Sequence, residues 1–295
     1  MQPSENKLVN HIRQMQPLII LGMHRSGTSL TTILLMNVGM HMGLRLSRDS
    51  EAVYFQRLNR KIFSQAGIKW GQVDHLIAAM ESEIFIESQS KNLLHFLFRP
   101  NLIPGLDKNI SIFFGYRQWQ QIKSNKIIHW GWKDPRTTIT FPIWLQIFPN
   151  AKFLHILRNG VDVAISIHRR SLVQQQKIRN RIIHLDFSPV TLNFEYSFRL
   201  WETYVNFVYQ YRHRIPNENY CEIRYEDLLT HPESQLRNLA NFAGISIEDR
   251  KINDACKIVN KRRLDNSQHY QAYAEQIRSL PHSNLMDKLN YTVEL

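Results

Sequence analysis

The sequence is poor in cysteine and has no long apolar run. Only Cys221 and Cys256 occur among its 295 residues, too few for a disulfide framework, which indicates a reducing compartment. No stretch of about 18 or more apolar residues is present, so we expect no membrane span and a cytoplasmic location. Residues 1–16 are polar, lack the apolar core of a signal peptide and are expected to form a flexible N-terminal segment.

The sequence also lacks internal boundaries and metal-binding patterns. No repeat and no linker rich in proline, glycine or serine divides it, so residues 1–295 are expected to form a single domain. Its 13 histidines are scattered, and it has no Cys-x-x-Cys and no spaced pair of histidines with a nearby acidic ligand. We therefore expect no metal at the functional site.

Acidic residues are outnumbered by basic ones. The chain has 37 Lys and Arg against 25 Asp and Glu, a net charge of +12, which favours anionic ligands such as nucleotides, acidic glycans or nucleic acid. A basic nucleic-acid-binding protein is one alternative, but it would need exposed aromatics interleaved with basic residues. The aromatics here follow core periodicities, as in residues 191–213, so no nucleic-acid partner is expected.

Residues 18–29 are the most informative segment of the chain. They read LIILGMHRSGTS, an apolar strand followed by a turn between Gly22 and Gly27 and then the start of a helix. Such a turn makes a cradle of backbone N–H groups that suits a phosphate. The glycines have the spacing of a Walker A loop, but Thr28 stands at the position of its lysine, and Arg25 supplies the charge from within the loop. A P-loop kinase or hydrolase, which needs that lysine and a Mg²⁺ ligand, is the other alternative.

Residues 153–166 repeat the strand-to-helix pattern. They read FLHILRNGVDVAIS, with Arg158 at the carboxyl end of the strand and Ser166 inside the helix that follows. Ligands bind at the carboxyl ends of the strands in open α/β sheets. An arginine and a serine that converge there suit a second phosphate, through charge-assisted bonds and a hydroxyl donor.

Alternating strands and helices predict an α/β fold with three layers, a central parallel sheet flanked by helices, of the P-loop-like nucleotide-binding type. Residues 173–190 have weak periodicity and are interpreted as a mobile loop over an acceptor site. The predicted strands are 18–22, 127–131, 153–157 and 220–224, and the predicted helices are 28–39, 51–66, 74–97, 140–148, 161–172, 191–213, 232–243 and 249–261.

Together these segments resemble the sulfotransferases that use 3′-phosphoadenosine 5′-phosphosulfate (PAPS). In that family the first loop holds the 5′-phosphosulfate, and an Arg-Asn-x-x-Asp-Val-Ala-x-Ser segment, here residues 158–166, holds the 3′-phosphate. Two further stretches resemble the family in the same order. Residues 132–136 (WKDPR) match the segment whose lysine lies close to the transferred sulfonate, and residues 223–228 (IRYEDL) match the segment whose tyrosine lies against the adenine. The resemblance extends over roughly residues 18–250.

The resemblance implies PAPS as donor, 3′-phosphoadenosine 5′-phosphate (PAP) as product, and a role for each matched residue. Lys133 is expected to stabilise charge on the sulfonate and the leaving phosphate, and Arg25 to contact phosphate or sulfonate. The other donor-binding residues that it implies are Ser26, Gly27, Thr28, Ser29, Arg158, Ser166 and Tyr225, with Arg262 and Arg263 in a basic C-terminal loop over the 3′-phosphate.

The general base is where the chain departs from the family's cytosolic members. Those members carry a histidine two residues after the lysine, and this chain has Pro135 there. Glu51 lies after the first helix, where bacterial-type and glycan sulfotransferases carry an acidic residue, and is the expected base, with Asp134 as the second candidate. A catalytically inactive member that still binds the nucleotide is a further alternative. Three histidines are interpreted as packed or capping residues: His24, His129 and His155.

Leu30 marks a second departure, because many cytosolic relatives have a tryptophan there that stacks on the adenine. This argues against the subgroup that sulfates drugs and steroids, and the Lys-Asp-Pro-Arg pattern resembles the carbohydrate and bacterial-type members. The chain is therefore expected to transfer a sulfonate from PAPS to a hydroxyl or amine of a small-molecule or glycan acceptor, possible classes being a carbohydrate or another polar metabolite.

Overall fold

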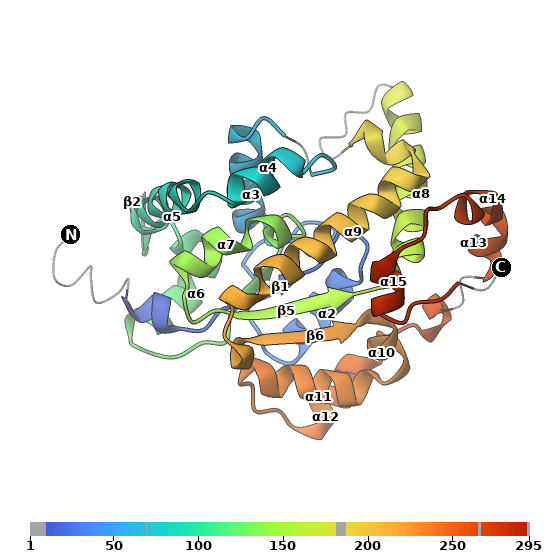
Figure 1. Ribbon diagram of the computed structural model, residues 1–295. Helices are drawn as coiled ribbons and strands as arrows, with labels where there is room; N and C mark the ends of the chain where they lie inside the picture. The colour runs from blue at the N-terminus through green and yellow to red at the C-terminus, as the bar shows by residue number, and fades with distance from the viewer. Residues whose placement is uncertain (1–9, 69, 181–186, 265–266, 294–295) are drawn as a thin grey trace.

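A parallel four-stranded sheet in the order β4-β1-β5-β6 lies at the centre of the protein (Figure 1). The computed structural model describes residues 10–68, 70–180, 187–264 and 267–293. The strands of the sheet are β1 (Leu18–Leu21), β4 (Gly131–Lys133), β5 (Lys152–Leu157) and β6 (Tyr220–Arg224); a separate antiparallel hairpin consists of β2 (Pro100–Ile103) and β3 (Leu106–Lys108). The strand order places the loop after β1 between the ends of β4 and β5.

Helices fill the crossovers between the strands and continue beyond β6. The α-helices are α2 (Thr28–Asn37), α3 (Val53–Gln65), α4 (Asp74–Met80), α5 (Glu83–Phe98), α6 (Ser111–Lys123), α7 (Thr137–Ile147), α8 (Gly160–Arg179), α9 (Phe194–Tyr211), α10 (Tyr225–Thr230), α11 (Pro232–Ala243), α12 (Asp249–Cys256), α13 (Ser267–Ala272), α14 (Ala274–Arg278) and α15 (Asn284–Lys288). The 3₁₀ helices are η1 (Pro189–Leu192), η2 (Arg212–Arg214), η3 (Asn217–Asn219) and η4 (Lys261–Leu264).

The sheet is buried on both faces. Ile19 and Leu21 of β1 belong to a cluster with residues of α3, α7 and α9, whereas Leu18 and Ile20 belong to a cluster with residues of α2, α11 and α12. In Figure 1, α7 and α9 lie above the sheet and α11 and α12 lie below it. All four side chains of β1 are buried, as a parallel strand covered on both faces requires. The predicted three-layer α/β fold is therefore confirmed.

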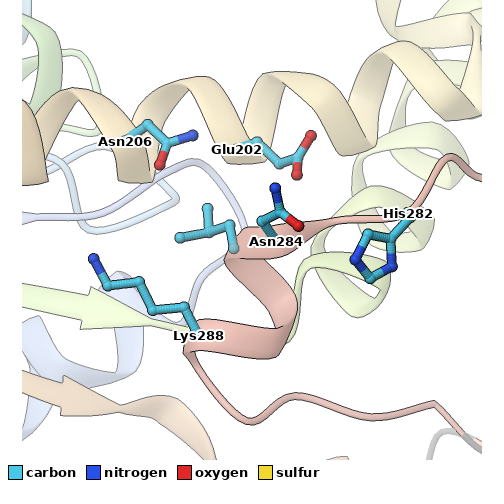
Figure 2. Close-up of a pocket in the computed structure, with 6 residues that line it drawn as sticks. Glu202, Asn206, His282, Asn284 and Lys288 are labelled. Atoms are coloured by element: carbon cyan, nitrogen blue, oxygen red, sulfur yellow. The ribbon is translucent and has the colours of Figure 1, made fainter.

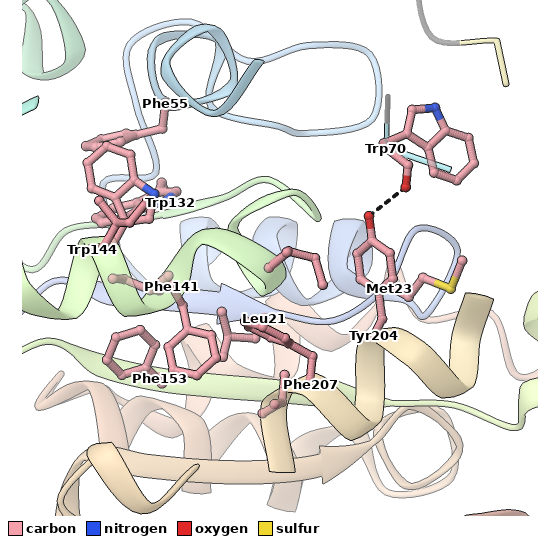
Figure 3. Close-up of a cluster of buried hydrophobic side chains, with 14 of the residues drawn as sticks. Leu21, Met23, Phe55, Trp70, Trp132, Phe141, Trp144, Phe153, Tyr204 and Phe207 are labelled. Atoms are coloured by element: carbon pink, nitrogen blue, oxygen red, sulfur yellow. Dashed lines mark hydrogen bonds between the residues drawn. The ribbon is translucent and has the colours of Figure 1, made fainter. Parts of the chain in front are cut away.

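Aromatic packing fixes the short strand β4. Phe55 of α3 stacks on Trp132 with ring centroids 4.0 Å apart and an interplanar angle of 7°. Trp144 of α7 meets both rings edge-on, at 5.2 Å from Phe55 and 5.3 Å from Trp132 (Figure 3). Offset and edge-on aromatic contacts add to the burial free energy of the rings. The residue directly before Lys133 is thus held by packing from two helices.

Three predicted elements have clearly different boundaries in the structure. The helix predicted at 249–261 ends at Cys256, and the 3₁₀ helix η4 begins separately at Lys261. The strand predicted at 127–131 is wrong, because pairing with β1 sets Gly131 opposite Leu18, and Ile127 is 77% exposed. The helix predicted at 74–97 is two helices, since Ser82 caps the start of α5 by accepting a hydrogen bond from the Phe85 N–H. The position of β4 is set by its pairing with β1 rather than by its own apolar residues, and the N-cap at Ser82 separates α4 from α5.

Two segments predicted to be mobile are ordered in part. Helix α8 continues to Arg179, because the Gln, Lys and Arg residues after 173 are good helix formers that need little burial. The rest of that predicted loop includes residues 181–186, which lie outside the described residues. Residues 10–14 are helical and Ile12 and Met15 are buried, which corrects the expected flexibility for 10–16. Residues 1–9 lie outside the described part of the chain.

Thr138 of α7 ties the loop after β1 to the core. Its hydroxyl donates to the Gly22 carbonyl at 3.1 Å and accepts from the Gly22 N–H at 2.9 Å. Thr138→Val keeps the volume but leaves both buried backbone groups unpaired, at about 1–3 kcal/mol each. We expect the free energy of unfolding, measured by chemical denaturation, to fall by about 2–4 kcal/mol.

Thr32→Val is the matched control for that substitution. Thr32 is equally buried, but its hydroxyl only donates to the Thr28 carbonyl within α2. This control should cost about 1 kcal/mol or less. Equal losses in the two variants would contradict the anchoring role of Thr138.

Candidate functional site

The loop between β1 and α2 turns tightly because two glycines have no space for a side chain. Gly22 and Gly27 have φ angles of 142° and 94°. A Cβ on Gly27 would lie 2.1 Å from the Tyr225 ring, and one on Gly22 would lie 2.9 Å from the Ile156 carbonyl oxygen. Gly27 is the N-cap of α2 and offers no side chain to its first amide groups. A helix start of this kind is suited to bind an anion.

The two predicted phosphate segments meet at this loop. Arg25 Nε donates to Ser166 Oγ at 2.9 Å, and Arg158 Nη1 donates to the Arg25 carbonyl at 3.0 Å. The Arg158 guanidinium lies over the Tyr225 ring, 4.9 Å from its centroid. Residues that the sequence placed in three separate motifs therefore form one cluster, which we call the phosphate cluster: Arg25, Arg158, Ser166 and Tyr225.

Arg158 has an N–H group that a ligand would satisfy. Its Nε is buried and has no hydrogen-bond partner among the described residues, while its Nη2 lies 3.5 Å from Asp162 Oδ2. Buried N–H groups without a partner are rare in folded proteins. A phosphate bound beside Arg158 would provide the missing acceptor, so the phosphate cluster fits the group that the sequence motif implies.

Lys133 reaches the same loop from β4. Its side chain is 1% exposed, and Nζ donates to Ser29 Oγ at 3.2 Å and to the Asp49 carbonyl. Burial lowers the pKa of Lys133, and the nearby carboxylates of Glu51 and Asp134 oppose this effect. The predicted catalytic lysine is therefore held at the first turn of α2.

Glu51 is buried beside that lysine. Its carboxylate lies 4.0 Å from Lys133 Nζ and 3.9 Å from Arg136 Nη1, and it accepts a hydrogen bond from Gln56 Nε2. Burial, and then the charge of Asp134, raises the pKa of Glu51, while Lys133 and Arg136 act in the opposite direction. A carboxylate with a raised pKa is a better proton acceptor near neutral pH than an exposed one.

Asp134, the second candidate base, has both carboxylate oxygens engaged in the core. Oδ1 accepts from Arg136 Nη1 at 3.0 Å, and Oδ2 accepts from Asn59 Nδ2 at 2.9 Å. The Asn59 side chain oxygen in turn accepts from Thr140 and Trp144. This fully buried network orients Arg136 toward Glu51 and disfavours Asp134 as the base.

The C-terminal segment returns to residues next to the phosphate cluster. The Tyr270 hydroxyl donates to Asp162 Oδ1 at 2.8 Å, and Asn159 Nδ2 donates to the Thr292 carbonyl at 3.1 Å. The predicted basic segment η4 packs against α10, the helix that begins at Tyr225. Arg262 is exposed and makes no described contact with the phosphate cluster, and the side chain of Arg263 lies outside the described part of the structure.

Ser26 and Thr28 are two further residues of the loop that the sequence predicts to bind the sulfonate donor. Both side chains are buried, at 1% and 3% exposure, and the Ser26 N–H donates to the Met23 carbonyl at 3.2 Å. Thr28 is the first residue of α2. Both residues therefore shape the loop from inside, rather than extending side chains to its surface.

His24 agrees with the interpretation as a packed residue, since it is 5% exposed and its ring contacts that of Trp70. The sequence did not predict that it has a buried Nε2 with no partner among the described residues. Its position directly before Arg25, between the two glycines, was the available signal. His155 agrees with the packed interpretation, since its Nδ1 lies 2.9 Å from both the Tyr220 hydroxyl and Glu222 Oε2.

A surface hollow of about 350 Å³ lies between α9 and α15, apart from these residues (Figure 2). None of the predicted site residues lines this hollow. Its lining residues are Glu202, Asn206, His282, Asn284, Leu285 and Lys288. Within the described ranges, no group of three or more His, Cys, Asp or Glu is placed to hold a metal ion. No helix in the described part of the chain is long and apolar enough to cross a membrane.

Comparison with known proteins shows similarity to sulfotransferases. The family model described as "Sulfotransferase family" matches residues 17–249. Protein-tyrosine sulfotransferase A of Caenorhabditis elegans is 26% identical over 120 residues, 41% of this chain. An omega-hydroxy-beta-dihydromenaquinone-9 sulfotransferase of Mycobacterium bovis is 30% identical over 116 residues, 38% of this chain. The matched segments span 28% of the length of each of these relatives.

A solved structure shares the fold along nearly the whole chain. The sulfotransferase domain from the curacin biosynthetic pathway has a TM-score of 0.51 and 16% sequence identity, covering 95% of this chain and 99% of that one. At this level of sequence identity the likeness shows a shared fold.

The contact between Gly27 and Tyr225 can be tested by adding a methyl group. Gly27→Ala places a Cβ against the Tyr225 ring at a φ of 94°, whereas Gly39→Ala has a similar φ of 102° and meets nothing within 4 Å. Both variants carry the backbone strain, and only the first carries the clash. We expect Gly27→Ala to lose at least about 1 kcal/mol more free energy of unfolding than Gly39→Ala. Equal losses would show that Tyr225 does not press on the loop.

Proposed function

The chain belongs to the sulfotransferase family, and on this premise we propose that it transfers a sulfonate group from PAPS to a hydroxyl or amine of an acceptor. The observation that carries the proposal is the convergence of Arg25, Arg158 and Ser166 at the glycine loop, which Lys133 reaches from the adjacent strand. Two neighbouring anion-binding positions suit a nucleotide with phosphates at both its 3′ and 5′ positions.

Each part of the donor has a proposed partner. The loop from Arg25 to Ser29 and the start of α2 bind the 5′-phosphosulfate, and Arg158 with Ser166 binds the 3′-phosphate. Tyr225 lies on the adenine side, where its ring already supports the Arg158 guanidinium. Arg262 and Arg263 are proposed to close over the 3′-phosphate, a role supported by the packing of η4 against α10.

The chemistry is a direct transfer. The acceptor oxygen forms a bond to sulfur while the bond from sulfur to the bridging phosphate oxygen breaks and leaves its electron pair on PAP. Lys133 and Arg25 offset the charge on the sulfonate and the leaving phosphate, an electrostatic contribution that is large in a buried site. Glu51 takes the proton of the acceptor hydroxyl, a role supported by its burial and its raised pKa.

We propose a hydroxyl as the acceptor group. The names of the two curated relatives refer to a tyrosine and to an omega-hydroxy compound, both of which carry a hydroxyl. The class of acceptor, a carbohydrate or another polar metabolite, remains the sequence-based proposal. It can be identified by screening small alcohols, phenols and glycans with PAPS.

Calorimetric titration tests the donor site directly. We expect the protein to bind PAP and to bind ATP with Mg²⁺ much more weakly. The double change Arg158→Ala and Ser166→Ala removes hydrogen bonds to the 3′-phosphate that are worth about 1.5–3 kcal/mol each when charged. PAP affinity should fall at least about 100-fold, with less than about a 3-fold change for adenosine 5′-phosphate, which has no 3′-phosphate.

Arg169→Ala is the control on the same helix. Its guanidinium contacts His269 rather than the phosphate cluster, so PAP affinity should be unchanged. Equal loss of both nucleotides in the double variant would remove the 3′-phosphate assignment. Preference of the unmodified protein for ATP with Mg²⁺ would overturn the proposed function in favour of a kinase.

Glu51→Gln tests the proposed base. Turnover of an acceptor found by the screen should fall at least about 100-fold, with PAP affinity within about 3-fold of the unmodified protein. Since Glu51 acts as a base only when ionised, wild-type turnover should fall as the pH drops through its raised pKa, above the ordinary 4.5 of a glutamate. The residual turnover of Glu51→Gln should lack this acidic limb.

Glu195→Gln, at an exposed position of α9 paired with Arg199, is the control and should leave turnover unchanged. Full activity of Glu51→Gln with an unchanged pH profile would exclude Glu51 as the base.

A further inference from the structure

His24 lies in the glycine loop, yet no role described above uses it. Its side chain is 5% exposed, and its ring centroid is 4.4 Å from that of Trp70, at an interplanar angle of 49°. Its Nε2 is buried without a hydrogen-bond partner among the described residues. Buried polar atoms without a partner are rare in folded proteins, so the position requires an explanation.

The segment that packs against the His24 ring, Trp70 and Gly71, is hydrogen-bonded to helix α9. The Trp70 carbonyl accepts a hydrogen bond from the Tyr204 hydroxyl at 2.9 Å (Figure 3), and the Gly71 carbonyl accepts one from the Tyr196 hydroxyl at 2.9 Å. Both tyrosines belong to α9, which packs along α8. The backbone at Trp70 is thereby anchored to α9, and the Trp70 ring holds the imidazole of His24 in its position within the loop.

Four cations from different parts of the fold act on His24 through their charge. Arg25 comes from the loop itself, Lys133 from β4, Arg136 from the start of α7 and Arg170 from α8. Burial first, and then these charges, lower the pKa of His24 well below 6.5. The ring is therefore neutral at physiological pH, with one nitrogen as donor and the other as acceptor. A neutral imidazole supplies a hydrogen bond without adding a fifth positive charge.

We propose that His24 is a further donor-binding residue, whose Nε2–H hydrogen-bonds a sulfonate oxygen of bound PAPS. The inference rests on the proposed function. His24 lies in the loop whose helix end Lys133 contacts through Ser29, and in the proposed function this lysine is close to the transferred sulfonate. The ligand oxygen pairs the otherwise orphaned nitrogen. Glu51 keeps the role of proton acceptor, and His24 holds the sulfonate in line for attack.

Comparing PAPS with PAP isolates this contact, because the two ligands differ only in the sulfonate, and the measurement needs no acceptor. His24→Phe keeps an aromatic ring against Trp70 but has no nitrogen, and His24→Gln retains an N–H donor. In calorimetric titrations we expect His24→Phe to weaken PAPS binding about 10-fold while PAP binding changes less than about 3-fold. That selective loss corresponds to about 1.4 kcal/mol. His24→Gln should recover part of it.

The alternatives give different results. Equal weakening of PAPS and PAP by His24→Phe, or no weakening of either, overturns the proposal. If His24→Phe does not fold, ¹⁵N imidazole spectra of the unmodified protein decide: PAPS, and not PAP, should move the Nε2 resonance of His24. Movement by both ligands or by neither overturns the assignment. Failure of the unmodified protein to bind PAP overturns the proposed function itself, and is seen before any variant is compared.

Discussion

Like charges crowded around one loop are the constraint on which the rest of the site depends. Arg25, Lys133, Arg136, Arg158 and Arg170 all lie close enough to influence this loop or its histidine. Burial, and then the charge of Arg170, lowers the pKa of Arg25. Cations held this close together in a fold need opposite charges to compensate for their repulsion.

Carboxylates from three segments of the chain provide that compensation. Lys133 has Glu51, Arg136 has Asp134, Arg158 has Asp162 and Arg170 has Asp49, at separations of 3.0 to 4.0 Å. The hydrogen bonds of Asn59 and Gln56 hold two of these carboxylates, Asp134 and Glu51. The aromatic stack of Phe55 on Trp132 then holds β4, and with it the backbone of Lys133, against the same helix, α3. Helix α3 therefore carries both the side chains that bind the two carboxylates and the aromatic ring that packs on β4.

The sequence was sufficient to predict that residues at or just after the ends of strands lie close together. Arg25, Arg158 and Lys133 follow or end apolar strands, and parallel strands bring their carboxyl ends to one edge. The sequence did not predict which side chains contact one another in the folded protein. Nothing in the local sequence shows that Gln56 donates to Glu51, that Asn59 meets Asp134, or that Trp70 covers His24. The β4 strand was misplaced for a related reason: its register depends on β1 rather than on its own apolar residues.

The contacts of this site join residues that are far apart along the chain. Arg25 and Ser166 are separated by 141 positions, Arg158 and the Arg25 carbonyl by 133, and Lys133 and Ser29 by 104. Contacts of such sequence separation form late in folding, because closing large loops costs entropy that only the assembled core offsets. The geometry of the loop itself depends on equally distant contacts, those of Thr138 with Gly22 and of Tyr225 with Gly27. A ligand that needs all of these groups together binds the completed fold, and its binding shifts the folding equilibrium toward that state.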